Sequence, residues 1–176
     1  MPVFVREAVR WLLAVVTAHQ YVVLFGVVAI EEAGLPLPVP SDLVIAFYGF
    51  RAREDPLRLG LVILVCALAS TFGTLLPFAL ARRYGMPVAR RLARFVDIDE
   101  REVARWTRRV ARNGFLAVLV GRLIPGARVA MSLVAGTAQV RPAVFAAAVF
   151  CAAAIYWSLW AALGGLLPWL YSNPEE

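Results

Sequence analysis

Residues 59–81 form a run of 23 residues without a single charged side chain. A helix rises about 1.5 Å per residue and the hydrocarbon core of a bilayer is about 30 Å thick, so about 20 apolar residues cross it. A second uncharged segment, 142–171, is longer than one crossing requires, and we expect Gly164, Gly165 and Pro168 to end or bend it. The two segments predict an all-α membrane protein with at least two transmembrane helices.

The composition agrees with a membrane protein. Hydrophobic residues make up 61% of the 176 residues and charged residues 17%, whereas soluble domains are nearer half apolar and a quarter charged. The segment 11–30 is also long and apolar enough for an N-terminal membrane helix. A net charge of +6 is compatible with nucleic-acid binding, but such a domain would have no place for this much apolar surface. We therefore expect a membrane and no nucleic acid as partner.

Residues 82–112 contain ten arginines and four acidic residues, so this one segment accounts for the net charge of +6. Positive residues are retained in the cytoplasm, which predicts a multi-pass protein of the inner membrane with 82–112 on the cytoplasmic side. We expect an amphipathic helix here that lies on anionic headgroups, with a solvated cytoplasmic helix as the alternative. Its basic face consists of Arg101, Arg105, Arg108, Arg109 and Arg112.

Two apolar segments are interrupted by helix-breaking residues. Segment 31–50 is too short to span and contains three prolines, which rule out a continuous helix. Segment 114–137 is interrupted in its middle. We expect both to be re-entrant hairpins, because irregular backbone at membrane depth must be buried in protein or line a wet cavity. The residues that would shape the hairpins are Gly34, Pro36, Pro38, Pro40, Pro125, Gly126 and Gly136.

Each interrupted segment precedes an uncharged one, 31–50 before 59–81 and 114–137 before 142–171. Such pairs in corresponding places indicate an inverted repeat with a binding site between the halves. The predicted architecture is a single membrane domain with two opposed re-entrant hairpins, each followed by a transmembrane helix. Whether the chain forms a homo-oligomer is left open.

Five charged residues lie within these apolar segments: Glu31, Glu32, Asp42, Arg122 and Arg128. Unpaired at mid-membrane, they would cost roughly 12–18 kcal/mol, as much as the stability of a whole domain. They must therefore be paired, protonated, hydrated or interfacial. Guanidinium groups bind phosphate through a planar fork of donors, and buried carboxylates can exchange protons near neutral pH. We expect the arginines to bind an anionic headgroup and the acids to pair with them or couple protons. The structural alternative is that the charges only join the hairpins.

The order of the motifs is distinctive. Glu31-x-x-Gly34-x-Pro36-x-Pro38 and Ser41-Asp42 come first; Gly121-Arg122-x-x-Pro125-Gly126-x-Arg128 and Ala135-Gly136 follow. Over roughly residues 20 to 170 the chain resembles the DedA family of bacterial membrane proteins, whose core is called the VTT or SNARE-associated domain in eukaryotic relatives.

The resemblance implies two opposed hairpins and movement of lipids between leaflets, including recycling of polyprenyl phosphates such as undecaprenyl phosphate, with proton dependence in some members. It places the functional acids at Glu31, or its neighbour Glu32, and Asp42, and the arginines at Arg122 and Arg128. Many members carry an acid after the glycine of the next span, whereas Thr74 follows Gly73 here. Proton or sodium coupling is therefore an open question for this chain.

From these features we expect a flippase- or scramblase-like transporter of a phosphorylated lipid, either a polyprenyl phosphate or a phospholipid. Two alternatives stay open: a proton-coupled transporter or channel for a small anion, and a non-transporting membrane scaffold. We expect no enzyme, metal or cofactor. The single histidine, His19, excludes a lipid phosphatase that needs at least two, and is remote from any serine it could activate.

Overall fold

A computed structural model describes residues 19–35, 41–51, 55–87, 91, 106–107, 109–111, 113–124 and 126–172. These residues are helical apart from turns and short connections. The helices are α2 (Gln20–Glu32), α3 (Ser41–Arg51), α4 (Pro56–Tyr84), α7 (Gly114–Arg122), α8 (Arg128–Thr137) and α9 (Pro142–Ser172). The all-α prediction is confirmed for this part of the chain.

Helix α4 contains the uncharged run and has clear sequence signals at both ends. Asp55 caps it by accepting a hydrogen bond from the backbone N–H of Arg58 at 3.0 Å, and Pro56 follows in the first turn. At the other end Gly85 adopts φ +69°, a conformation that suits glycine. The helix is therefore 29 residues long, about 44 Å at 1.5 Å per residue.

The sequence predicted that Gly164, Gly165 and Pro168 end or bend this segment. Helix α9 continues from Pro142 to Ser172, so these residues do not end it. Gly164 has another role. A methyl group there would overlap the backbone of Ala46 in α3, so the glycine permits close contact between the two helices. An absent side chain at such a contact is typical of helix packing in membranes.

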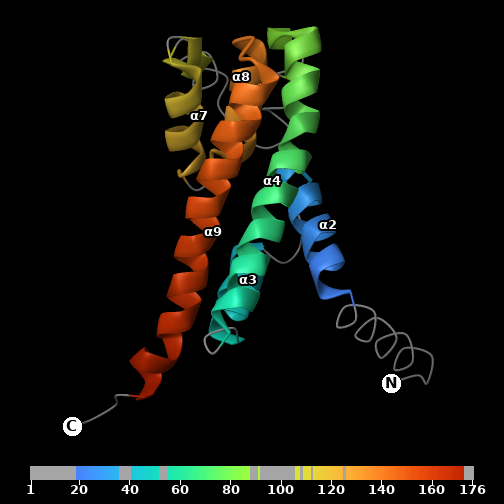
Figure 1. The fold of residues 1–176 in the computed structure, drawn as a ribbon. Helices are drawn as coiled ribbons and strands as arrows, with labels where there is room; N and C mark the ends of the chain where they lie inside the picture. The colour runs from blue at the N-terminus through green and yellow to red at the C-terminus, as the bar shows by residue number, and fades with distance from the viewer. Residues whose placement is uncertain are drawn as a thin grey trace.

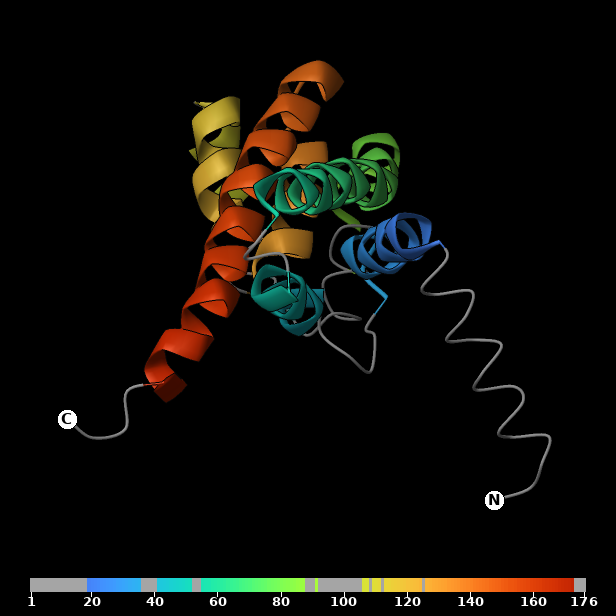
Figure 2. The ribbon, with the colours of Figure 1, turned by 60° about the horizontal axis from the view of Figure 1, so that its bottom comes forward.

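The four short helices form two pairs that approach the middle of the molecule from opposite ends (Figure 1). Helices α2 and α8 pack mainly on α4, whereas α3 and α7 pack mainly on α9, so each pair has one helix on each of the two long helices. Figure 2 shows α9 crossing the molecule with α4 beside it. Two glycines with positive φ stand at the turns that follow α2 and α7, Gly34 at +97° and Gly126 at +80°.

The apolar core is divided in the same way. One cluster surrounds α7 and α8, and in it Phe78 of α4 stacks on Phe145 of α9 with ring centroids 4.2 Å apart. The other cluster surrounds α2 and α3 and includes the fully buried Ile45 and Trp157. Each helix pair therefore has its own packing against the two long helices.

Large apolar side chains remain exposed along the whole of α4, at the helical spacing expected for one face: Leu57, Leu61, Leu64, Leu68, Phe72 and Leu76. Exposed apolar stripes of this length are found where a protein meets lipid or a partner. By length and composition, Pro56–Tyr84 and Pro142–Gly164 could each cross a membrane, with mean hydropathies of 2.3 and 1.9.

Several predicted features lie outside the described residues. They are all of 11–18, most of 82–112, four hairpin prolines and four of the basic-face arginines: Pro36, Pro38, Pro40, Pro125, Arg101, Arg105, Arg108 and Arg112. Within that segment Val110 is buried in the core, whereas Arg109 is exposed with its guanidinium 5.1 Å from the ring centroid of Trp106. Val110 thus lies on the apolar face and Arg109 on the polar face, as the helical spacing predicts.

Close packing between α2 and α4 can be tested at Gly73, where an added methyl group would overlap the backbone carbonyl of Ala29. We expect Gly73→Ala to destabilise the protein by about 1–3 kcal/mol, because backbone cannot rotate away from the clash. Gly60 lies in the same helix, and a methyl group added there would have no neighbour within 4 Å, so Gly60→Ala is the control. It should be neutral or raise stability by about 0.5–1 kcal/mol through helix propensity. Thermal unfolding in detergent measures both, and equal melting temperatures would contradict the packing.

Candidate functional site

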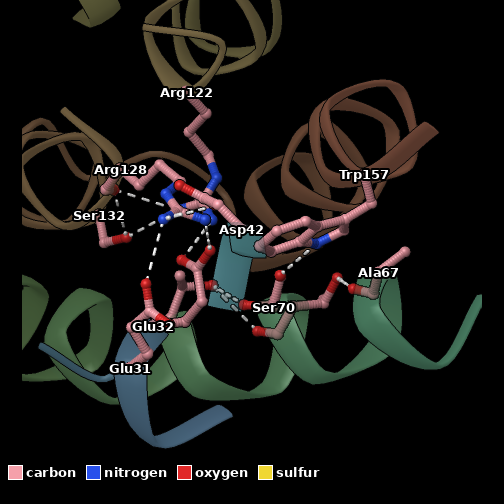
Figure 3. A network of polar contacts seen from close by, with 11 residues as sticks. Glu31, Glu32, Asp42, Ala67, Ser70, Arg122, Arg128, Ser132 and Trp157 are labelled. Atoms are coloured by element: carbon pink, nitrogen blue, oxygen red, sulfur yellow. Dashed lines mark hydrogen bonds and ion pairs between the residues drawn. The ribbon is translucent and has the colours of Figure 1, made fainter. Parts of the chain in front are cut away.

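The predicted site residues meet where the two helix pairs face each other (Figure 3). Arg122 at the end of α7 donates from Nη2 to Oε2 of Glu32 at the end of α2, at 2.6 Å. Both side chains are almost fully buried, with 2% and 3% of their surface exposed. Nη1 of Arg122 also donates to the backbone carbonyl of Arg128 at 3.1 Å and to Oγ of Ser132 at 3.3 Å. Arg122 thus has hydrogen-bond partners from both halves of the chain.

Arg128, the first residue of α8, contacts three acids. Its guanidinium lies 3.3 Å from Oε1 of Glu32, 3.2 Å from Oε1 of Glu31 and 3.6 Å from Oδ1 of Asp42. Its side chain is 16% exposed, while Glu31 and Asp42 are 20% and 22% exposed. Arg128 is therefore more accessible than Arg122 and is shared among more carboxylates.

Two aromatic rings of α9 complete the surroundings of Arg128. The guanidinium carbon lies 4.9 Å from the ring centroid of Tyr156 and 5.3 Å from that of Trp157, close enough for cation–π attraction. The Tyr156 hydroxyl donates to Oδ2 of Asp42 at 3.2 Å, and the indole N–H of Trp157 donates to Ser70 at 3.1 Å. The rings are thereby held in place by α3 and α4.

Glu31 links the end of α2 to the beginning of α3. Its Oε2 accepts the backbone N–H of Ser41, the first residue of α3, at 3.1 Å, and its Oε1 accepts from Arg128. The free N–H groups and the dipole of a helix N-terminus favour an anion there. The carboxylate of Glu31 therefore occupies an anion position formed by α3 and Arg128.

We call Glu31, Glu32, Asp42, Arg122 and Arg128 the central charge cluster. Two guanidinium groups face three carboxylates, so the arginines have no spare charge when all three acids are ionised. A narrow cleft beside Glu32 and both arginines is lined by Ala152, Ala153, Tyr156 and Trp157, and it leaves no space for a water molecule. In this conformation the cluster is closed.

The structure brings together all five charged residues that the sequence singled out, and it distinguishes the adjacent glutamates. Glu32 is the buried partner of Arg122, whereas Glu31 caps α3 and faces Arg128. Gly136 does not shape the turn: it lies within α8, where a methyl group would overlap the Phe78 carbonyl of α4.

Four polar or aromatic residues contribute to the site although the sequence predicted no role there for them: Ser41, Ser132, Tyr156 and Trp157. Signals for two of them were present. Ser132 lies four residues after Arg128 and so on the same face of a helix, and a tyrosine hydroxyl inside an uncharged segment requires a partner. Ser41 stands beside Asp42 in the motif, but nothing in the motif indicates its contact with Glu31, and Trp157 had no signal.

The family model described as the VTT domain matches residues 39–166. The chain belongs to the VTT-domain family. The matched part includes Asp42, Arg122 and Arg128, whereas Glu31 and Glu32 precede it. In this VTT-domain protein a helix outside the matched residues thus supplies the two glutamates of the central charge cluster.

Two curated relatives are membrane proteins whose names assign no activity. The "Uncharacterized membrane protein YbfM" of Bacillus subtilis (strain 168) is 23% identical over 110 residues, which cover 62% of this chain and 67% of the relative. The "Uncharacterized membrane protein slr0232" of Synechocystis sp. (strain ATCC 27184 / PCC 6803 / Kazusa) is 28% identical over 122 residues, covering 68% of this chain and 55% of the relative. The chain thus matches about two thirds of one relative's length and about half of the other's. No solved structure matches it significantly.

Thr74 follows Gly73 in α4, at the position where the resemblance to the DedA family suggests an acid. Thr74 is fully buried, and its hydroxyl donates to the backbone carbonyls of Ser70 at 2.8 Å and Thr71 at 3.1 Å. Its polar group is therefore satisfied within its own helix.

The buried pair can be tested by removing one charge and then both. Glu32→Met leaves the guanidinium of Arg122 buried without a carboxylate, and we expect a loss of about 3–5 kcal/mol in stability. Adding Arg122→Met should restore most of it, because a methionine pair strands no charge. Arg58→Met, which breaks the exposed pair with Asp55, is the control and should cost at most about 1 kcal/mol. Denaturant unfolding in mild detergent gives all three free energies of unfolding. A double variant no more stable than Glu32→Met would show that the loss does not come from an unpaired buried guanidinium.

Proposed function

We propose that this VTT-domain protein moves a phosphorylated lipid, a polyprenyl phosphate or a phospholipid, between the leaflets of a membrane in the manner of a flippase or scramblase. The observation that carries the proposal is the state of Arg128: a partly accessible guanidinium, buttressed by two aromatic rings and shared among three carboxylates. Such a group can exchange one anionic partner for another without being left unpaired.

The two arginines have different roles in this proposal. Arg122 is buried and holds Glu32 and the backbone of α8, so it fixes the geometry. Arg128 binds the phosphate, because its fork of N–H donors matches phosphate oxygens and it is the accessible member of the pair. The expectation that both arginines bind the headgroup directly is thus narrowed to one of them.

Binding requires the central charge cluster to open, because the cleft leaves no space even for water. An incoming phosphate must displace a carboxylate from Arg128. The displaced acid, Glu31 or Asp42, is then neutralised by a proton or turned toward water, since an unpaired buried charge is costly. Loading of the lipid is in this way linked to the state of the acids.

The proposal includes a position in the bilayer. Helices α4 and α9 cross the inner membrane, with the apolar stripe of α4 facing lipid and 82–112 in the cytoplasm. The pairs α2–α3 and α7–α8 are opposed re-entrant hairpins that meet near the midplane. The ion pairs between them support this arrangement, because charges at that depth must be paired.

Transport is tested with the full chain in liposomes that contain a fluorescent polyprenyl phosphate or phospholipid in one leaflet. We expect Arg128→Gln to reduce the leaflet-exchange rate at least tenfold and Arg128→Lys to retain part of it, because lysine keeps the charge but not the bidentate fork. A rate unchanged by Arg128→Gln would overturn the assignment.

A matched control separates transport from folding. Arg58 is exposed and carries the same charge outside both the cluster and the basic face, so Arg58→Gln should leave exchange near the wild-type rate. Melting temperatures of all variants identify any that fail to fold. Transport of a small anion is the alternative to be tested, because the same guanidinium donors bind free phosphate. Uptake of inorganic phosphate without any lipid exchange would replace the lipid proposal with that alternative.

A further inference from the structure

We infer that the N-terminus of α3 is a phosphate subsite, formed by the backbone N–H and hydroxyl of Ser41 together with Arg128, and that the carboxylate of Glu31 occupies it until the ligand arrives. This inference rests on the proposed function, because it takes Arg128 as the residue that receives the phosphate. It adds a binding residue and an internal competitor that the charged motifs do not reveal.

The first observation is the position of the Glu31 carboxylate. One oxygen accepts the Ser41 N–H at 3.1 Å and the other accepts from Arg128 Nη2 at 3.2 Å. A carboxylate held between a helix N-terminus and a guanidinium occupies the place that a phosphate would take, since both anions use the same donors. Helix α3 is eleven residues long, enough for a developed dipole.

The second observation is independent of Glu31. The side chain of Ser41 is buried, with 1% of the residue exposed, and its Oγ has no hydrogen-bond partner among the residues that the structure describes. Leaving a buried hydroxyl unbonded costs about 1–3 kcal/mol, so such groups are rare and call for a reason. The hydroxyl belongs to the residue whose N–H holds the Glu31 carboxylate. A phosphate has more acceptor oxygens than a carboxylate and can accept from both groups.

The two observations give Glu31 a definite role. The Glu31 carboxylate accepts from the Ser41 N–H and from Arg128, but within the described residues neither of its oxygens accepts from the Ser41 hydroxyl. A phosphate in the same place would satisfy all three donors. The Glu31 carboxylate therefore occupies the subsite with fewer hydrogen bonds than a phosphate would make, and it competes with the ligand.

The competition predicts a gain of affinity on removing an acid. The full chain in lipid nanodiscs is titrated with short-chain phosphatidic acid, with the matched diacylglycerol as the uncharged control lipid. We expect Glu31→Gln to lower the Kd about tenfold, because the amide can still accept the Ser41 N–H and preserve the fold but no longer competes as an anion.

Asp42→Asn is the matched variant. It removes a charge 3.6 Å from the same guanidinium, but Asp42 accepts no hydrogen bond from the Ser41 N–H. Its Kd should fall by less than that of Glu31→Gln. If both variants lowered the Kd equally, the gain in affinity would come only from the loss of a negative charge near Arg128, and the subsite would be overturned.

The role of the Ser41 hydroxyl is tested in the Glu31→Gln background, where no carboxylate of residue 31 occupies the subsite. Adding Ser41→Ala should raise the Kd about tenfold, the value of one hydrogen bond to a charged group, and Ser41→Thr should restore binding. No change with Ser41→Ala would refute the inference. The same ranking with inorganic phosphate in place of the lipid would support the subsite and identify free phosphate as a source of ligand.

The outcomes separate this inference from the proposed function. If the wild-type chain moves no lipid but the ranking of Kd values holds, the transport proposal fails and the subsite stands. If lipid exchange depends on Arg128 but Glu31→Gln binds phosphatidic acid no tighter than wild type, the subsite fails and the transport proposal stands.

Discussion

The ion pair between Arg122 and Glu32 joins residues 90 positions apart, and the arrangement of both helix pairs depends on it. Each pair packs mainly on α4 and α9, and within the described helices α2 and α3 make few close backbone approaches to α7 and α8. Long charged side chains bridge the two pairs instead. The strongest link across the middle of the molecule is thus electrostatic, whereas most of the apolar packing lies within each half.

This division has a mechanical consequence. Two apolar clusters that are packed separately can move relative to each other at a lower cost than one continuous core, because close-packed interiors resist deformation. Breaking the contacts of Arg128 would separate the turn after α2 from the turn after α7 without unpacking either cluster. The buried pair of Arg122 would keep the halves in register while this happens.

Glycines set the rotation of the helices that present the charges. Gly73 lets α2 approach α4 at Ala29, two and three residues before Glu31 and Glu32. That contact decides which glutamate is buried, and nothing in the order Glu31-Glu32 indicates it. The sequence could therefore predict the charged set, the breaks between helices and the all-α class, since each follows from local composition and the cost of charge in an apolar medium.

The roles of Gly164, Tyr156 and Trp157 could not be predicted, because they depend on contacts between helices that are distant in sequence. Glycine is common at the ends of helices, which is why Gly164 was expected to end one. In the structure it lies within a continuous α9 and allows α3 to pack closely against it. Tyr156 and Trp157 are indistinguishable in sequence from the other aromatic residues of the last segment. Only the rotation of α9, fixed by the Trp157–Ser70 hydrogen bond and by Gly164, places their rings against Arg128.

Charge balance explains why a site built in this way would contain three acids for two arginines. Replacing one carboxylate on Arg128 by a phosphate keeps the number of anionic groups around the two guanidinium groups constant, so neither arginine is left unpaired in a medium of low dielectric. With only Glu32 and one further acid, the same exchange would leave Glu32 as the only carboxylate on Arg128. The third acid thus allows Glu32 to remain a structural partner while Glu31 and Asp42 are free to exchange, and the proposed site needs this separation if it is to bind and release an anion without unfolding.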